Sequence, residues 1–317
     1  MRLCEHGDFA AAITETAAHH GLSEQVVEKD YFITEVLRTV CSHYGEKVIF
    51  KGGTSLSKGW DLIRRLSEDV DLLVPVDRFE PPLGSNRAPR ELEVMRDMIG
   101  QHVGLTLHGH DSEKFDGGRS RRDPFGYETN FDLIGLAPTV IAEPGVAGGV
   151  WPAEIRQIES QVGRFLRDQG SVHIAEDLEA FGAHTLHYRR TFVEKLFLVH
   201  ALAERLLNAD KPFDRDARHY YDLYVLAGQA EVREMLKSEE LSEIKSDCSE
   251  ISLKHFPKQY TAPEQLSFRE SSALFPPSDL KKQIRADYQQ QCALLCFGSV
   301  PDFETVLDRF EEIRAWL

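Results

Sequence analysis

The chain has 317 residues and a net charge of −15, with 42% hydrophobic and 28% charged residues. This composition is typical of a folded globular protein and excludes an intrinsically disordered chain. The acidic balance argues against a general nucleic-acid coat protein, because phosphate contacts require clustered cations. The sequence has neither an apolar run of 18 residues nor a basic-then-apolar leader, so we expect no membrane segment and a cytoplasmic location.

The N-terminal part predicts alternating helices and strands. Ser23 is placed to cap a helix, because apolar residues follow it at helical spacing as far as Val40. An apolar strand at 48–50 precedes a glycine turn, after which a new helix can begin. The further predictions in chain order are a strand at 69–74, a helix at 89–103, a strand at 104–108, a polar mobile loop at 111–124 and a strand at 136–143.

Helical spacing dominates from about residue 191 to Trp316, with a proline-containing break around 256–279. We therefore predict an α/β (α+β) fold with two domains. Residues 1–190 form a core with a mixed sheet in this prediction, and residues 191–317 form a helical domain.

The cysteines and histidines predict no metal centre. The five cysteines are scattered and include no CxxC pair, so neither a disulfide framework nor a zinc site is indicated. Cys292 and Cys296 could share a helix face, where two small buried side chains are the simplest interpretation. Histidines such as His200 and His219 lack metal-ligand spacing and are interpreted as ordinary polar residues.

Two aspartates on one predicted strand carry the strongest chemical signal. Asp69 and Asp71 are two residues apart, so their side chains point to the same side, roughly 6.5–7 Å apart along the strand. Two carboxylates at this spacing repel each other unless a cation lies between them. Oxygen ligands favour Mg²⁺, which keeps positions open for phosphate oxygens.

A glycine turn precedes these aspartates. Gly52 and Gly53 follow a predicted strand and open a helix with Thr54 and Ser55. Glycines let the backbone approach a phosphate, and a helix N-terminus offers free N–H donors. Taken alone, the glycines could form a plain tight turn, and the aspartates could lie on a solvent-facing strand edge. Together, a phosphate turn and a metal pair indicate in-line phosphoryl chemistry.

The segments KGGTSLSK (51–58) and RRLSEDVD (64–71) resemble the nucleotidyltransferase signature, and more closely the AbiEii/AbiGii toxin family, which includes the MenT toxins. Segments 26–37, 191–202 and 218–226 support this narrower resemblance, which spans most of residues 23–230. The resemblance implies a nucleotidyltransferase-like core that uses Mg²⁺ and an NTP. It also implies nucleotide transfer to the 3′ end of tRNA and the role of a toxin paired with an antitoxin protein.

The resemblance also implies roles for individual residues of the turn. Gly53 and Ser55 would hold the triphosphate, with Gly52, Thr54 and Lys58 nearby. Asp69 and Asp71 would bind the metal. Ser67 matches a serine beside the metal pair, where an antitoxin kinase could also act.

Two matching residues lie in the predicted helical region. Lys195 matches a lysine expected to contact the nucleotide, and its ammonium could neutralise phosphate charge. A surface lysine paired with a glutamate is the plainer interpretation. Asp222 matches the aspartate of the family's xYDL segment, and a helix pair with Arg218 is its alternative.

A third carboxylate is expected to act as the base for the attacking hydroxyl. Glu143 is chosen by its position at the end of a predicted strand. Pro144 follows directly and removes a donor where the strand would continue, so Glu128 and Asp132 remain alternatives. Lys29 and Asp30 are interpreted as structural residues that brace the glycine turn.

Three other possibilities remain open from the sequence. The acidic charge also suits a protein hydroxyl as acceptor, as in AMPylation, and a nucleotide-binding partner protein without catalysis is a third reading. The arginine clusters 64–65, 119–122 and 189–190 could each contact a local RNA end, although a charge cluster is usually a solvated face.

Overall fold

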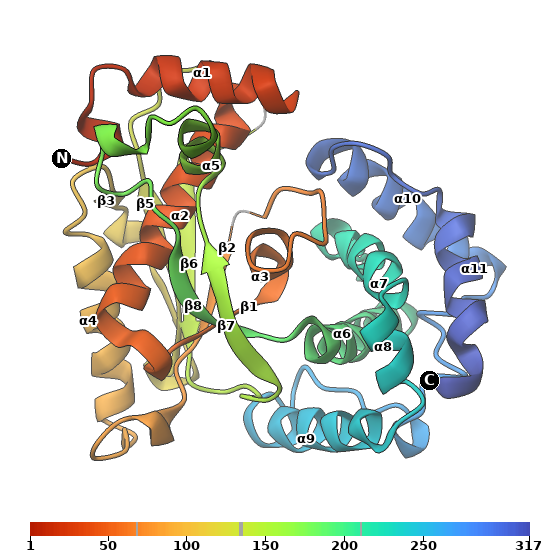
Figure 1. The fold of residues 1–317 in the computed structure, drawn as a ribbon. Coiled ribbons are helices and arrows are strands. Elements are labelled where there is room, and N and C mark those ends of the chain that lie inside the picture. The colour runs from red at the N-terminus through yellow and green to blue at the C-terminus, as the bar shows by residue number, and fades with distance from the viewer. Residues whose placement is uncertain (68, 133–135, 210) are drawn as a thin grey trace. The chain divides into compact units, whose positions relative to one another are not determined.

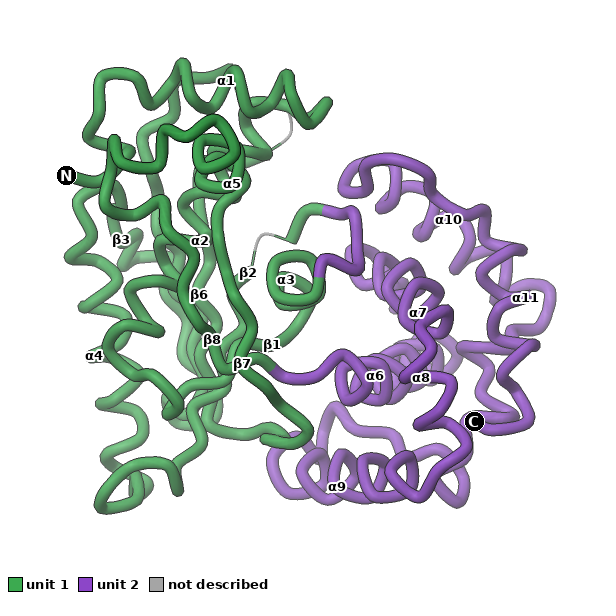
Figure 2. Tube along the Cα trace, in the orientation of Figure 1, with its two compact units in different colours: residues 1–60, 66–185 green, residues 61–65, 186–317 purple. Residues whose placement is uncertain are grey.

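A computed structural model describes residues 1–67, 69–132, 136–209 and 211–317, in which the chain divides into two units (Figures 1 and 2). Unit 1 consists of residues 1–60 and 66–185, and unit 2 of residues 61–65 and 186–317. The short stretch 61–65 thus leaves the first unit and joins the second. A division into functional domains at 1–190 and 191–317 stays a prediction.

Unit 1 contains a mixed sheet, as predicted. Its described strands follow the order β3-β5-β6-β2-β1-β8-β7, and β4 pairs with β5. Strand β2 is antiparallel to β1 and parallel to β6, while β5 is antiparallel to β6. The strands are β1 Ile49–Lys51, β2 Asp69–Leu73, β3 Thr106–Leu107, β4 Glu113–Phe115, β5 Ser120–Gly126, β6 Thr139–Gly145, β7 Ala153–Ile158 and β8 Phe181–Leu186.

Helices α2 and α4 pack against one face of this sheet (Figure 1). The Ser23 hydroxyl caps α2 by accepting from the Val26 N–H at 3.4 Å, as predicted. Val70 and Leu72 on β2 are buried in the core to which α2 and α4 contribute. The alternation of a strand therefore leaves Asp69 and Asp71 on the opposite face. The helices of unit 1 are α1 Phe9–His20, α2 Glu24–Tyr44, α3 Gly52–Lys58, α4 Arg87–Ile99 and α5 Gln161–Asp168.

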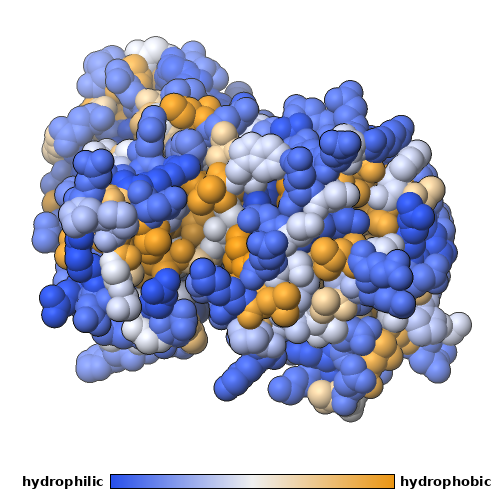
Figure 3. Space-filling model, turned by 90° about the horizontal axis from the view of Figure 1, so that it is seen from below, coloured by the Kyte–Doolittle hydropathy of each residue, from blue (hydrophilic) through white to orange (hydrophobic). Residues whose placement is uncertain are grey.

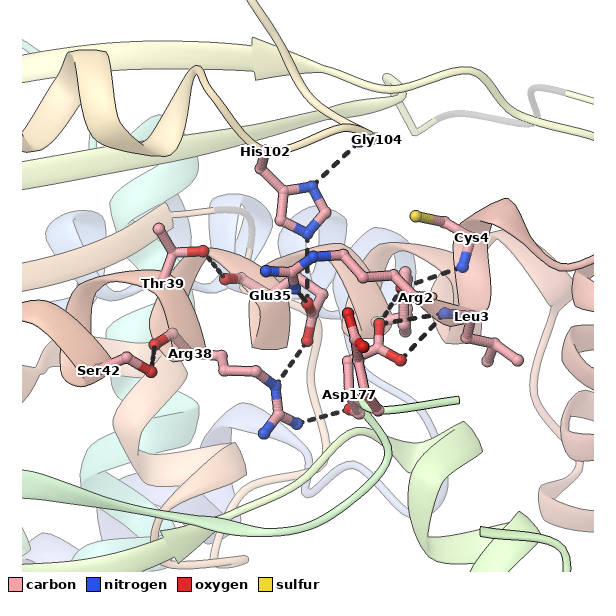
Figure 4. Close-up of polar contacts among 12 residues, drawn as sticks. Arg2, Leu3, Cys4, Glu35, Arg38, Thr39, Ser42, His102, Gly104 and Asp177 are labelled. Atoms are coloured by element: carbon pink, nitrogen blue, oxygen red, sulfur yellow. Dashed lines mark hydrogen bonds and ion pairs between the residues drawn. The ribbon is translucent and has the colours of Figure 1, made fainter. Parts of the chain in front are cut away.

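Buried Glu35 of α2 holds the N-terminal segment against the rest of unit 1 (Figure 4). Its carboxylate is paired with Arg2, with Arg38 at 2.8 Å and with His102 at 3.2 Å. The neighbouring Asp177 accepts from the Leu3 N–H at 3.0 Å. Burying a carboxylate is costly unless ion pairs or hydrogen bonds satisfy its charge. These contacts satisfy Glu35 and Asp177 and thereby fix Arg2 and Leu3 in place.

The prediction of a polar loop at 111–124 was wrong, because this stretch contains β4 and most of β5. The polar side chains of β5 satisfy each other. Arg121 and Asp123 point to the same side and form two hydrogen bonds of 2.8 Å, and both are buried. An internal ion pair thus lets a charged sequence form an inner strand, which an apolar pattern cannot reveal.

Unit 2 is helical, as predicted for the C-terminal region. Tyr220 lies at its centre, with ring centroids 5.4 Å from Phe303 and 5.7 Å from Phe213. The buried hydroxyl of Tyr220 donates to the Ala273 carbonyl at 2.8 Å. The described helices are α6 Tyr188–Ala209, α7 His219–Ala227, α8 Ala230–Met235, α9 Glu239–His255, α10 Ser278–Leu295 and α11 Phe303–Ile313.

No helix among the described residues is long and apolar enough to span a membrane. The face drawn in Figure 3 is mostly hydrophilic and carries separate apolar patches. The most exposed apolar side chains, such as Val103 and Leu294, come from distant parts of the sequence. Scattered apolar side chains of this kind are normal on globular proteins.

Candidate active site

Charged residues form a row across four adjacent strands of unit 1. Asp71 on β2 is paired in register with Lys51 on β1 and with Glu143 on β6. Arg122 on β5 donates to Glu143, with 3.2 Å between Nε and Oε1. The sheet register therefore places two carboxylates side by side between two cations.

Asp69 lies on the same face of the sheet as this row. It is two residues before Asp71, and both are half-buried, whereas Val70 between them is fully buried. The structure thus brings Asp69, Asp71 and Glu143 to one face of the sheet. Glu128 and Asp132 are exposed in the segment after β5, outside this row.

The strand that carries Glu143 continues through the following proline. Pro144 is paired in register with Leu72, and β6 ends only at Gly145. The Gly145 carbonyl accepts from the Val74 N–H at 2.8 Å, so pairing resumes immediately after the residue that lacks a donor. The strand predicted at 136–143 therefore continues through Pro144 to Gly145.

Gly52 makes the close approach between the turn and the metal pair possible. Its φ is +74°, in the left-handed region. A Cβ built on it would lie 1.9 Å from Oδ2 of Asp71, which leaves no room for any side chain. The backbone of the turn between β1 and α3 therefore contacts the Asp71 carboxylate directly.

The two hydroxyls of the turn contact backbone carbonyls. Thr54 donates to the carbonyl of Asp69, and Ser55 donates to the carbonyl of Gly52 at 2.9 Å. Both residues are buried, and so is Gly53, which precedes them in α3. These contacts fix the turn against β2, and direct phosphate contacts by Gly53, Thr54 and Ser55 stay a prediction.

Lys58 at the end of α3 forms an ion pair of 2.5 Å with Asp30 of α2. Asp30 also accepts from the Gln161 N–H at 2.8 Å, and Lys29 donates to the Ala137 carbonyl at 3.1 Å. Asp30 thus contacts α3, the helix that follows the glycine turn, whereas Lys29 contacts the segment before β6, so a direct role of either residue in bracing the turn stays a prediction. Lys58 is committed to Asp30 in this structure, and its predicted nucleotide contact is untested.

The electrostatics of the row are dominated by the three carboxylates. Burial, Asp69 and Asp71 together raise the pKa of Glu143 to about 7, and Arg122 opposes this rise. Ionising all three groups together is costly, and a divalent cation would offset that cost.

The donor set fits Mg²⁺ bound through a substrate. Within the described part of the chain, no group of three or more His, Cys, Asp or Glu side chains is gathered closely enough to hold a metal ion. Mg²⁺ commonly uses one or two carboxylates and takes its other ligands from phosphates and water. Asp69 and Asp71 are hard oxygen donors of the required kind.

Unit 2 contains a second buried charge cluster, centred on Asp222 of α7. Arg65 binds its carboxylate with two hydrogen bonds of 2.7 Å, from Nε and Nη2. Nζ of Lys195, from α6, lies 2.8 Å from Oδ2 of Asp222 and 2.9 Å from Nδ1 of His219. Lys195 is therefore neither on the surface nor paired with a glutamate, because it shares the buried carboxylate with Arg65.

Two cations surround one carboxylate in this cluster. Burial lowers the pKa of Lys195, while Asp222 raises it. Burial would raise the pKa of Asp222, but Arg65 and Lys195 outweigh it and hold this pKa well below its usual range. Burial and Lys195 lower the pKa of His219, so its neutral ring can accept from the ammonium. The cluster thus holds two basic side chains, Arg65 and Lys195, against one buried carboxylate.

Sequence reasoning missed three residues at these places. Arg65 anchors Asp222, Arg122 contacts Glu143, and His219 contacts Lys195. The spacing of His219 three residues before Asp222 on one helix was a usable signal. In the arginine clusters proposed for RNA, Arg65, Arg121 and Arg190 are buried in ion pairs, which removes them from the surface.

Ser67 is half-buried and lies two residues before Asp69. Only residues 66–68 separate Arg65, which binds Asp222, from Asp69, the first of the two predicted metal ligands. No structure is described for residue 68, and the role of Ser67 stays a prediction.

Comparisons with known proteins agree with the fold and with the family resemblance. Residues 35–309 match the sequence profile of the family described as nucleotidyl transferase AbiEii toxin, type IV TA system. No curated protein matches the sequence. The fold is similar to that of MenT4, a nucleotidyltransferase toxin from Mycobacterium tuberculosis H37Rv, with a TM-score of 0.58 and 17% identity. That comparison covers 96% of this chain and 88% of MenT4.

Proposed function

Because the chain belongs to the AbiEii family of nucleotidyltransferase toxins from type IV toxin–antitoxin systems, we propose that it transfers a nucleoside monophosphate from an NTP to a hydroxyl acceptor. Pyrophosphate is the second product. The observation that carries this proposal is the register that places Glu143 beside Asp71, with Asp69 on the same face of the sheet.

Asp69 and Asp71 are the proposed ligands of Mg²⁺. When bound, the ion neutralises phosphate charge and polarises the α-phosphate toward attack. Gly52 supports this assignment, because its missing side chain lets the backbone turn lie against Asp71. Gly53, Thr54 and Ser55 complete the turn on which the triphosphate is proposed to lie.

Glu143 is the proposed base for the acceptor hydroxyl. Asp69 and Asp71 help to raise its pKa to about 7, and a cation bound to them would lower this pKa, so the Glu143 carboxylate would be ionised near neutral pH and able to accept a proton. Arg122 at 3.2 Å orients the carboxylate and can stabilise its ionised form. Proton removal makes the acceptor oxygen the nucleophile, and the bond from the α-phosphate to the leaving pyrophosphate breaks.

Lys195 is the proposed phosphate contact in unit 2, and Asp222 is the proposed positioning residue for it. Arg65 binds the Asp222 carboxylate with two hydrogen bonds and Lys195 pairs with it as well, so two cations face one negative charge. The Lys195 ammonium then retains charge for a phosphate oxygen, where a buried cation has a large effect. His219 accepts from the same ammonium and limits its orientations.

The proposed acceptor is the 3′ end of tRNA, and the proposed protein partner is a cognate antitoxin. Both follow from the family resemblance. Ser67 beside the metal pair is a candidate for modification by an antitoxin kinase, because a phosphate next to Asp69 would repel the triphosphate.

The test is incubation of the protein with α-labelled NTPs, Mg²⁺ and total tRNA, followed by gel analysis with and without RNase. We expect label in RNA that RNase removes. The net charge of −15 favours one rival, a protein hydroxyl acceptor, which would give label that resists RNase. Absence of label in RNA and in protein, beside an active family member, would refute nucleotide transfer.

A further inference from the structure

Two thiols line a cavity at the C-terminal end of α10. The cavity has a volume of about 310 Å³ and is lined by Tyr288, Cys292, Cys296 and Val300 among others. Cys292 lies in the last turn of α10, and Cys296 caps this helix with extended backbone angles. The Cys296 N–H donates to the Cys292 carbonyl at 3.0 Å. The two cysteines therefore lie one helical turn apart, at the same cavity.

This spacing is compatible with a disulfide. Four residues of helix rise by about 6 Å, and bridged cysteines have Cα atoms about 4.4–6.8 Å apart. Because Cys296 lies beyond the end of α10, it can turn toward Cys292 without a rearrangement inside the helix.

The two sulfur atoms are chemically unequal. A hydrogen bond from Cys296 lowers the pKa of the Cys292 thiol, whereas the same interaction raises the pKa of Cys296. A thiol that ionises more readily is the better nucleophile, and its neighbour can then resolve the product. This division of roles makes Cys292 the attacking sulfur.

Cys296 is also connected to the cluster around Asp222. It forms an isolated antiparallel bridge with Arg65, and the Phe297 N–H donates to the Arg64 carbonyl at 2.9 Å. Arg65 in turn holds Asp222 with its two hydrogen bonds of 2.7 Å. Movement of the backbone at Cys296 would thus reach Arg65 through direct contacts within unit 2.

We propose that Cys292 and Cys296 are an oxidation site for hydroperoxides, and that the disulfide they form loosens the contact of Arg65 with Asp222. The Cys292 thiolate attacks one peroxide oxygen, the O–O bond breaks, and the leaving alcohol or water takes a proton. Cys296 then attacks the sulfenic acid, a disulfide forms, and water leaves. Two thiols are oxidised by two electrons, and one peroxide is reduced.

The direct test is peptide mass spectrometry of the full chain after hydrogen peroxide treatment and alkylation. We expect a Cys292–Cys296 disulfide, and Cys292 should react at least about tenfold faster than Cys41. Burial raises the pKa of Cys41 to about 12, which makes it the matched unreactive thiol. Equal reaction rates, or peroxide oxidation without this disulfide, would overturn the proposal.

The connection to Arg65 needs its own measurement. Amide hydrogen exchange at residues 64–66 should become faster in the oxidised protein, return after reduction with dithiothreitol, and stay unchanged in peroxide-treated Cys296→Ser. Unchanged exchange in fully disulfide-bonded protein would overturn the connection. Any effect on nucleotide transfer rests on the proposed function, whereas disulfide formation does not. A disulfide formed in a protein that never transfers nucleotides would refute only the function.

Discussion

Glu143 lies directly opposite Asp71 in the parallel register of β6 and β2. Two carboxylates in this relationship repel each other, and the raised pKa of Glu143 indicates that its ion pair with Arg122 offsets only part of this repulsion. Such a cost is expected where a site binds a metal-bound substrate, because binding then relieves the repulsion.

Replacing Glu143 with Gln should separate stability from activity. Without divalent cations, we expect E143Q to be more stable than the original protein by roughly 0.2–1 kcal/mol, because one of two neighbouring negative charges is removed. Nucleotide transfer should fall about 100-fold or more, because the amide cannot accept the proton. Urea unfolding and the transfer assay check both. The control E128Q removes an exposed carboxylate and should change neither stability nor nucleotide transfer. If E128Q lost more transfer than E143Q, Glu128 rather than Glu143 would be the base.

Replacing Gly52 with Ala should displace Asp71. The new Cβ would lie 1.9 Å from Oδ2 of Asp71, in addition to the cost of a left-handed backbone, about 1–2 kcal/mol. Gly45 is the matched control, since its φ is +53° but nothing lies within 4 Å of a new Cβ. Both variants should lose stability in thermal unfolding, and G52A alone should lose nucleotide transfer. Equal transfer by the two variants would show that the approach to Asp71 is not needed.

Replacing Lys195 with Met should remove activity and preserve the fold. Arg65 and Asp222 remain as a bidentate pair, so no buried charge is left without a partner. We expect stability within about 1 kcal/mol of the original and a loss of transfer of about 100-fold or more. The half-buried Lys245 of α9 provides the control K245M, which should transfer normally. If K195M unfolds or retains full transfer, its role is structural.

The buried His219 should make stability depend on pH. Its pKa is lowered in the folded protein by burial and Lys195, so the unfolded chain takes up a proton first as the pH falls. The contribution is therefore fully present above the unfolded pKa, about 6.5, and is lost as the pH falls through the lowered folded value. The variant H219Q should lose less stability between pH 7.5 and 5.5 in urea unfolding. An identical loss in both proteins would show that His219 does not titrate on unfolding.

The sequence predicted the parts of the site that depend on local patterns. The spacing of Asp69 and Asp71 predicted their common face, and helical spacing predicted α2 and α6, each of which the structure confirms. The mixed sheet and the family were also confirmed. Strand alternation and helix periodicity act within a few residues, so a single sequence can reveal them.

Features that depend on distant residues could not be predicted in this way. Arg65 binds Asp222 from 157 residues away, whereas the local i,i+4 pattern pointed only to Arg218. Strand β5 was missed because Arg121 and Asp123 neutralise each other. Strands β7 and β8 had no prediction, since their alternation is weak and their pairing joins separate segments.

Calorimetric titration of an NTP into the protein, with Mg²⁺ and with EDTA, tests the central assignment of Asp69 and Asp71 most directly. A nonhydrolysable NTP analogue keeps binding separate from transfer. We predict binding that requires Mg²⁺, is lost in Asp71→Asn, and persists in E143Q, which lacks only the base. If the original protein in EDTA and the Asp71→Asn variant both bound the analogue as tightly as the original protein with Mg²⁺, this would contradict a metal-bound nucleotide at this row of carboxylates.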